Sequence, residues 1–189
     1  MCLSVRQGGF MSNTELIGYL MQKGYEWIVE QRNLHIINAH ELSEQDKASL
    51  EPYFEPNILS LAKIELVDNI ENPPFYSEIM KLGITNLIDF TQMAGITFID
   101  CILISRRISH SQKSWTSLLF HEMVHIVQYY LLGARRFAEL YVVGWAQNSF
   151  DYESIPLEKQ AHNLQQQFDQ GGGLFSVVKL LKRHLEHVG

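Results

Sequence analysis

The second half of the chain alternates between apolar segments and short polar breaks. Residues 95–105 are rich in β-branched and aromatic side chains and are bounded by turn or polar positions, which predicts a strand. From 115 to 132, apolar residues recur at helical spacing, and Ser114 and Gly133 stand where an N-cap and a C-terminal glycine are expected. The same spacing predicts further helices over 134–147, 157–167 and 174–187.

The first half of the chain has a weaker pattern. It predicts a helix over 14–31, a helix over 47–53 and a strand over 61–67. Asn13 can cap the first of these helices, and Ser43 stands before the second as a start signal. Residues 71–87 predict no clear element. Together the elements predict an α+β fold, with a small mixed sheet before a mainly helical C-terminal part.

The length of the chain, 189 residues, fits one domain. We expect this domain to span residues 13–170. Residues 1–12 are expected to form a disordered N-terminal extension, because they precede the first periodic segment. Residues 171–189 are expected to add a glycine hinge and an amphipathic C-terminal helix that packs on the same domain.

Composition narrows the function classes. Hydrophobic residues make up 46% of the chain and charged residues 19%, so it can bury a core. The net charge of -6 gives no general attraction to nucleic acid or to an anionic membrane. Cys2 and Cys101 are too few for a disulfide framework, and no segment has the apolar length of a signal peptide or a membrane span. These features predict a cytoplasmic protein, with non-classical export left open.

Residues 121–125 have the sequence HEMVH, which is an HExxH motif. His121 and His125 lie four positions apart, so on a helix their imidazoles share one face and can converge on one zinc ion. Glu122 projects beside that face, where it can take a proton from a zinc-bound water and return it to a leaving amine. The motif predicts a zinc site with two histidine ligands and Glu122 as the general base.

The surroundings of the motif add to this prediction. A shuffled chain of this composition would contain HExxH roughly 3 times in 100, so the pentapeptide alone does not decide the matter. The motif lies in the middle of an apolar helix, where ionisable side chains are rare and need a metal or full hydrogen bonding. The other interpretation is a helix with two histidines on a polar face and a solvated glutamate.

A catalytic zinc site usually has a third protein ligand and one open position. Glu158 is the favoured third ligand because Pro156 fixes the start of its helix and places Glu158 in the first turn. His162 is the alternative, since it follows four residues later on the same helical face. Cys101 lies in a strand-like apolar run, where cysteine behaves as a small hydrophobic residue, so we do not expect it to bind the metal.

Two segments, HEMVHIVQYY and YESIPLEKQA, resemble the zincin metallopeptidases, and among them the small single-domain gluzincins. The matching positions are Gly95, Thr97, His121, Glu122, His125, Gln128, Tyr152, Pro156, Glu158 and Ala161. The resemblance spans residues 94–165. It implies a zincin-like fold with HExxH on the active-site helix, zinc ligands His121, His125 and Glu158, and Glu122 as general base. The chain departs from thermolysin-like enzymes at His162, where those enzymes carry an aspartate.

The expected reaction also needs a donor for the negative charge that develops on the substrate oxygen. Tyr152 is the candidate, because its loop leads into the helix of Glu158, and Tyr141 is a weaker one. The sequence thus predicts a metallopeptidase with Zn²⁺ as cofactor and a peptide or protein as substrate. The alternative is a non-catalytic zinc-binding protein with an interaction or regulatory role, in which Glu158 and His162 would both bind the metal and close the site.

Overall fold

The computed structural model describes residues 12–81, 83–107, 111–148 and 150–185. Within these residues there are seven α-helices and a four-stranded mixed sheet, which confirms the predicted α+β class. The helices are α1 (Asn13–His35), α2 (Glu44–Leu50), α3 (Pro56–Leu61), α4 (Tyr76–Lys81), α5 (Gln112–Gln147), α6 (Pro156–Asp169) and α7 (Val177–Leu185). The strands are β1 (His40–Glu41), β2 (Lys63–Val67), β3 (Gly95–Phe98) and β4 (Cys101–Ser105), and short 3-10 turns occupy Phe90–Gln92 and Tyr152–Ser154.

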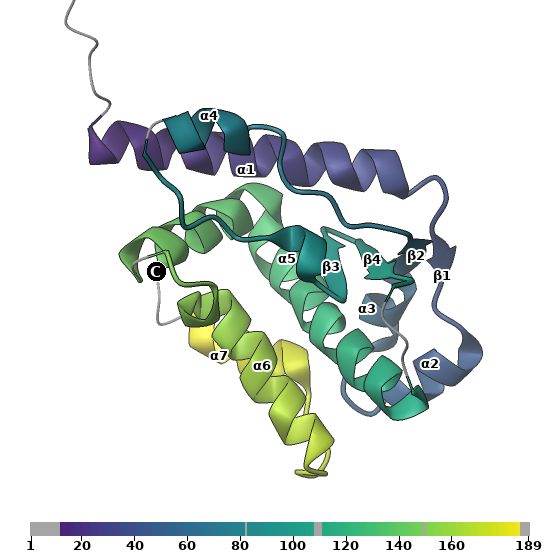
Figure 1. The fold of residues 1–189 in the computed structure, drawn as a ribbon. Helices are drawn as coiled ribbons and strands as arrows, with labels where there is room; N and C mark the ends of the chain where they lie inside the picture. Colours follow the sequence, from purple (N-terminus) through teal and green to yellow (C-terminus); the bar gives the residue numbers. More distant parts are fainter. Residues whose placement is uncertain (1–11, 82, 108–110, 149, 186–189) are drawn as a thin grey trace, which may run out of the picture.

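The sheet has the order β1-β2-β4-β3, so β3 is an edge strand (Figure 1). β2 and β4 run parallel, whereas β1 and β3 are antiparallel to their neighbours. Every residue of β4 is buried, as expected for a strand covered on both faces. Its side chains alternate between two hydrophobic cores: Ile102 and Ile104 join one, and Cys101 and Leu103 join the other.

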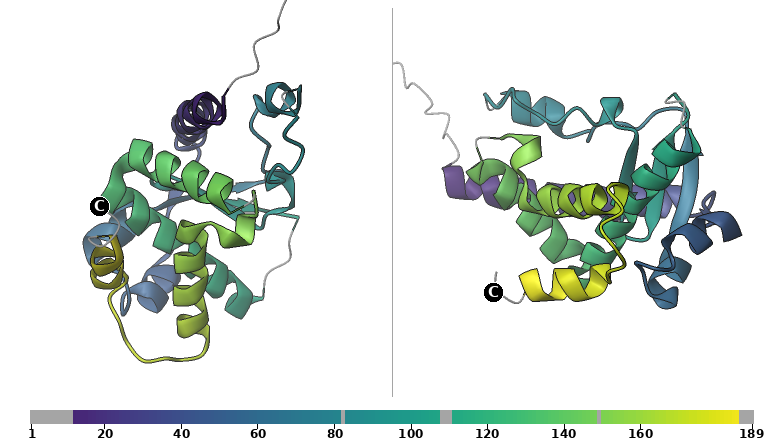
Figure 2. Two further views of the ribbon diagram at one scale, coloured as in Figure 1. Left: turned by 90° about the vertical axis from the view of Figure 1, so that its left-hand side faces the viewer. Right: turned by 90° about the horizontal axis from the view of Figure 1, so that it is seen from below.

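We name these cores after the helices that cover them. The α7 core contains Phe120, Val124, Val177 and Leu181 together with β4 residues. The α1 core contains aromatic residues from α1, β3 and α5, which are Trp27, Phe98, Tyr129, Phe137 and Trp145. Helices α1 and α7 lie on opposite sides of α5, which contributes to both cores (Figure 2).

Helix α5 holds the predicted active-site segment and bends at Gly133. Gly133 has φ 73° and ψ 159°, a conformation that interrupts the helix and that only glycine adopts readily. The predicted division into helices over 115–132 and 134–147 is therefore confirmed. The predicted start was wrong by three residues, because Ser111 is the N-cap and its hydroxyl accepts a hydrogen bond from the backbone N–H of Ser114 at 3.2 Å.

The single strand expected over 95–105 was also wrong. The segment forms a hairpin of β3 and β4, in which Phe98 pairs with Cys101. The turn needs a left-handed residue, and Ile99 takes that conformation with φ 63°. A bidentate ion pair from Arg32 of α1 to Asp100, at 2.7 and 2.8 Å, holds the turn in place.

Several boundaries near the N-terminus differ from the prediction. Helix α1 is capped by Ser12 rather than Asn13, since Ser12 and Glu15 form a reciprocal capping box. Ser43 caps α2 as expected, and α4 lies in the segment that gave no clear pattern. The expected extension of residues 1–12 lies outside the described residues except for Ser12. None of the described helices combines the length and apolar character that crossing a membrane requires.

Candidate metal and active site

Four buried ionisable side chains meet where the middle of α5 packs against the start of α6. His121, Glu122 and His125 come from α5, and Glu158 comes from the first turn of α6. Their exposed fractions are 7%, 4%, 6% and 3%, respectively. Ionisable groups are rarely buried to this degree without a compensating partner. The structure therefore brings the predicted motif and the favoured third ligand together.

The two histidines and Glu158 place three donor atoms close together. The Nε2 atoms of His121 and His125 are 3.1 Å apart, and Oε2 of Glu158 lies 3.4 Å from each of them. In a tetrahedral zinc site with bonds of ~2.0–2.1 Å, neighbouring donor atoms are separated by roughly 3.3–3.4 Å. The triangle formed by the three atoms thus has the size that such a site requires.

Gln165 fixes which ring nitrogen of His121 carries the proton. Nδ1 of His121 lies 3.1 Å from Oε1 of Gln165, and the amide nitrogen of Gln165 donates to the backbone carbonyl of Ser117 at 3.1 Å. Because a carbonyl can only accept, Gln165 must present its oxygen to His121. Nδ1 of His121 is therefore the donor, and its Nε2 keeps a lone pair unless the ring takes up a second proton.

A second glutamine fixes His125 in the same way. Nδ1 of His125 lies 2.8 Å from Oε1 of Gln128, whose amide nitrogen donates to the backbone carbonyl of Leu157 at 3.0 Å. Outer hydrogen bonds of this kind are the usual support of metal-binding histidines, because they orient the ring and raise the basicity of the inner nitrogen. Both inner nitrogens consequently face the carboxylate of Glu158.

This arrangement attracts positive charge. Oε2 of Glu158 is buried and has no hydrogen-bond partner among the described residues. Burial lowers the pKa of His125, but the negative charge of Glu158 outweighs burial and raises that pKa to about 9. Burial also raises the pKa of Glu158, but the positive charge of His125 and the close approach of both histidine rings hold it well below its usual value. Two imidazoles and one carboxylate are a donor set that suits zinc.

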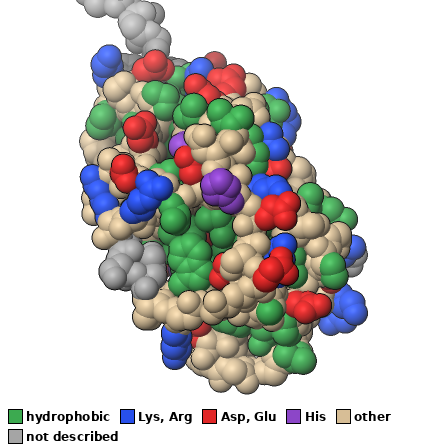
Figure 3. Space-filling model, turned by 90° about the vertical axis from the view of Figure 1, so that its right-hand side faces the viewer, with side chains coloured by type: hydrophobic (Ala, Val, Ile, Leu, Met, Phe, Trp, Pro, Cys, Tyr) green, Lys and Arg blue, Asp and Glu red, His purple; other side chains and the backbone are tan. Residues whose placement is uncertain are grey.

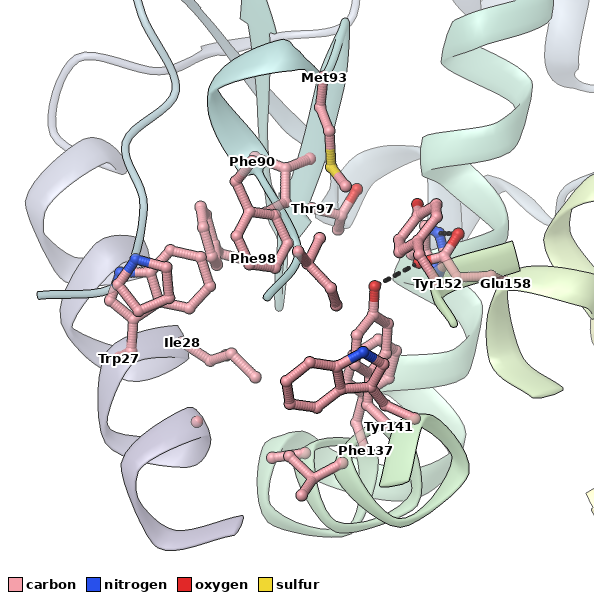
Figure 4. A pocket seen from close by; sticks show the side chains of 18 of the residues that line it. Trp27, Ile28, Phe90, Met93, Thr97, Phe98, Phe137, Tyr141, Tyr152 and Glu158 are labelled. Atoms are coloured by element: carbon pink, nitrogen blue, oxygen red, sulfur yellow. Dashed lines mark hydrogen bonds and ion pairs between the residues drawn. The ribbon is translucent and has the colours of Figure 1, made fainter. Parts of the chain in front are cut away.

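Two tyrosines lie beside Glu158. The hydroxyl of Tyr141 donates to Oε1 of Glu158 at 2.8 Å and so orients the carboxylate (Figure 4). Tyr152 also faces Glu158, and burial together with the charge of that carboxylate raises the pKa of Tyr152 well above its usual value. Tyr141 thus holds the Glu158 carboxylate with a direct hydrogen bond, and Tyr152 lies beside the same carboxylate.

Glu122 is held from the sheet. The hydroxyl of Thr97 on β3 donates to Oε2 of Glu122 at 2.7 Å. A Cβ atom at Gly95 would lie 2.8 Å from Oε1 of Glu122, closer than side chains tolerate. The edge strand β3 therefore positions both oxygens of Glu122. The hydroxyl of Thr97 binds one oxygen, and the missing side chain at Gly95 leaves room for the other.

His162 lies at the margin of the cluster. One of its ring nitrogens, together with donor atoms of His121 and Glu158, forms a group in which all atoms lie within 4.8 Å of one another. Its ring is 4.6 Å from that of His121, but its side chain is 44% exposed and Nε2 lies 3.8 Å from Oε2 of Glu153. The group with His125 is tighter and fully buried, so Glu158 fits the third position better than His162.

The cluster opens into an apolar cavity of about 110 Å³. Figure 4 shows Tyr152 and Glu158 at one side of this space and Trp27 and Ile28 of α1 at the other. The ionisable groups therefore stand at the edge of an apolar space. Figure 3 shows one face of the molecule, on which hydrophobic side chains line a hollow in the surface.

Sequence reasoning missed the residues that support the cluster from other elements. No pattern in the sequence predicts the contact of Gln165 with His121 or that of Tyr141 with Glu158, because both contacts depend on how α6 packs on α5. Gln128, Gly95 and Thr97 were named only as matching positions, without a structural role. Cys101 is buried in β4 as part of the α1 core, and burial raises the pKa of its thiol to about 12.

No protein-family model, no curated protein and no solved structure matches this chain. Its function must therefore be inferred from the chemistry of the cluster.

Proposed function

We propose that the protein is a zinc-dependent metallopeptidase of the gluzincin kind, with His121, His125 and Glu158 as metal ligands. One observation supports this more than any other. Two imidazole nitrogens and a buried carboxylate oxygen without a hydrogen-bond partner face one another at 3.1–3.4 Å, with both outer nitrogens engaged by glutamines. The three atoms lie close enough together to bind one divalent cation, which would take the place of the contacts that they make with one another.

Zinc held by these residues would supply Lewis acidity, which polarises a peptide carbonyl and makes a nearby water more acidic. Glu122 takes the proton of the attacking water and passes it to the leaving nitrogen. Thr97 fixes one oxygen of Glu122 through its hydrogen bond, so the carboxylate keeps its orientation during the transfer. Glu122 sits directly beside the ligand His121, which gives it access to the same substrate.

Tyr152 is the proposed donor to the oxygen that becomes negative. It lines the cavity next to Glu158, and its raised pKa keeps it protonated, as a hydrogen-bond donor must be. The edge strand β3 provides a second element of substrate binding. Because β3 lies at the end of the sheet and supplies Gly95 and Thr97 to the site, an extended peptide added along it would pass over Glu122.

The alternative is a zinc-binding protein without hydrolytic activity. It is favoured by one observation, the closeness of His162 to His121 and Glu158, because a fourth protein ligand would close the site. The two functions differ in what His162 does. In the peptidase, removing the His162 imidazole leaves zinc affinity nearly unchanged; in the closed site, it weakens zinc binding.

The test is zinc titration of metal-free protein, combined with hydrolysis of a mixed peptide library. We expect equimolar zinc binding by the wild type, its loss in His125→Ala, and its retention in Glu122→Gln. Hydrolysis should fall about 10²–10⁴-fold in Glu122→Gln, the range of a lost general base. If the protein binds zinc but cleaves no peptide, and His162→Ala weakens zinc binding, the site is the closed, non-catalytic one. A protein that binds no zinc contradicts both functions.

A further inference from the structure

The cavity extends from the ionisable cluster to the middle of helix α1. Glu122 and Glu158 line one end, and Gly24, Trp27 and Ile28 of α1 line the other. It is therefore a continuous space that begins where the reacting bond would lie and ends against a helix almost a hundred residues earlier in the chain.

The walls of this cavity are apolar and largely aromatic. Among the described residues that line it there is no lysine and no arginine, and its only acidic side chains are those of the cluster itself. The aromatic lining residues are Trp27, Phe75, Tyr76, Phe90, Phe98, Tyr129, Phe137, Tyr141, Trp145 and Tyr152. Such walls favour an uncharged apolar group, and the two glutamates at one end of the cavity repel an acidic group.

The size of the cavity limits its occupant. An apolar protein cavity of about 150 Å³ holds one benzene molecule. The volume of about 110 Å³ here is of the same order and suits one isobutyl or phenyl group. A phenyl or isobutyl group attached to a backbone beside the cluster is the side chain of phenylalanine or leucine.

We propose that this cavity binds one large apolar side chain of the substrate, next to the bond that is cut, and that Gly24 sets its depth. The proposal rests on the proposed function for the identity of the substrate as a peptide. A Cβ atom at Gly24 would lie 3.6 Å from Cγ2 of Val142, which also lines the cavity, so a methyl group fits there without a clash and takes up space.

Gly18 offers a matched control on the same helix. It is exposed, and a Cβ atom there would meet nothing within 4 Å. Both Gly18→Ala and Gly24→Ala improve helix propensity by about 1 kcal/mol, so they affect the stability of α1 similarly. Only Gly24→Ala narrows the cavity.

The first experiment measures binding without catalysis. The probes are the N-acetyl amides of phenylalanine, leucine, alanine and aspartate, titrated into Glu122→Gln protein with and without zinc and followed by indole fluorescence and NMR. We expect the phenylalanine and leucine probes to bind at least about tenfold more tightly than the alanine probe, and the aspartate probe most weakly. Equal affinity for the phenylalanine and alanine probes would overturn the proposal.

The second experiment uses the glycine pair in the same Glu122→Gln background. Gly24→Ala should weaken binding of the phenylalanine probe about three- to tenfold and leave the alanine probe unchanged, whereas Gly18→Ala should change neither. Identical affinities in the two glycine variants would show that Gly24 does not set the depth.

The outcomes separate this inference from the proposed function. If the apolar probes bind but wild-type protein cleaves no peptide, the cavity is a binding site and the peptidase proposal fails. If wild-type protein cleaves peptides with zinc but shows no preference for phenylalanine or leucine beside the cut bond, the function holds and the inference fails.

Discussion

The two hydrophobic cores of this protein share helix α5 and strand β4, yet they are built differently. In the α7 core, Phe120 is fully buried and its ring stacks on Phe168 at 4.4 Å and contacts Phe54 at 5.1 Å. In the α1 core, the rings surround the cavity of about 110 Å³ that leads to the cluster. One side of α5 is thus tightly packed in the α7 core, and the other side faces the cavity in the α1 core.

The difference assigns a role to each core. Metal-binding side chains need a rigid support, because a displacement of a fraction of an ångström changes the donor triangle. For the proposed metal ligands, the α7 core would give that support through Phe120 and Val124, which are neighbours of the histidines along the helix. The α1 core leaves contacts unmade around its cavity, which lowers stability and provides space for a ligand.

The largest expected effect is a difference in stability between two phenylalanines. Phe120→Ala removes a ring packed on all sides in the α7 core and should lower the free energy of unfolding by about 4–5 kcal/mol. Phe90→Ala removes a ring that lines the cavity and should cost about 2–3 kcal/mol, because part of its surface has no packing partner to lose. Urea unfolding of metal-free protein measures both. Equal losses would mean that the cavity does not weaken the α1 core.

The next effect is a pH dependence that belongs to the cluster. Burial lowers the pKa of His125, but Glu158 outweighs it and raises the pKa to about 9, above the unfolded value of 6.5. The resulting stabilisation is complete below pH 6.5 and is lost as pH rises through about 9. Metal-free protein should lose roughly 2–4 kcal/mol over this range.

Zinc should reverse this trend, since it replaces the proton and binds more tightly as pH rises. Thermal unfolding from pH 6 to 10, with and without zinc, measures the effect. His125→Gln serves as the control, and its stability should not fall in this window. If the stability of the metal-free wild type stays constant from pH 6.5 to 9, Glu158 does not raise the pKa of His125.

The smallest expected effect separates a supporting residue from its exposed neighbour. Gln165→Ala removes the acceptor of the Nδ1 proton of His121 and should weaken zinc binding about 10–100-fold. Gln166 lies on the exposed side of α6, so Gln166→Ala should leave zinc binding unchanged. Competition with a chelator gives both affinities. Similar affinities for the two variants would show that the outer hydrogen bond does not support the ligand.

The sequence predicted the parts of the site that are local. His121, Glu122 and His125 follow from spacing along one helix, and Pro156 placed Glu158 in the first turn of the next. Sequence reasoning could not identify Gln165 as the partner of His121. A glutamine becomes such a partner only through the packing of α6 on α5, which no pattern within either helix records.

The fold was predictable to a similar extent. Helical spacing and glycine punctuation located the break at Gly133, because the break is a local backbone property. The hairpin within 95–105 was missed because its turn places Ile99, a β-branched residue, where glycine is usual. The ion pair between Arg32 and Asp100 joins that turn to a distant helix, so its stabilisation is invisible in the local sequence.

The absence of a side chain at Gly95 offers a criterion for distinguishing active from inactive homologues of this protein. A Cβ atom there would displace the carboxylate of Glu122, and the atoms nearest to that Cβ all belong to Glu122. Under the proposed function, a homologue with an intact HExxH motif but an alanine at this position should still fold and take up zinc, but it should hydrolyse peptides poorly. The residue at this position on β3 would then predict peptidase activity among relatives where the HExxH motif alone does not.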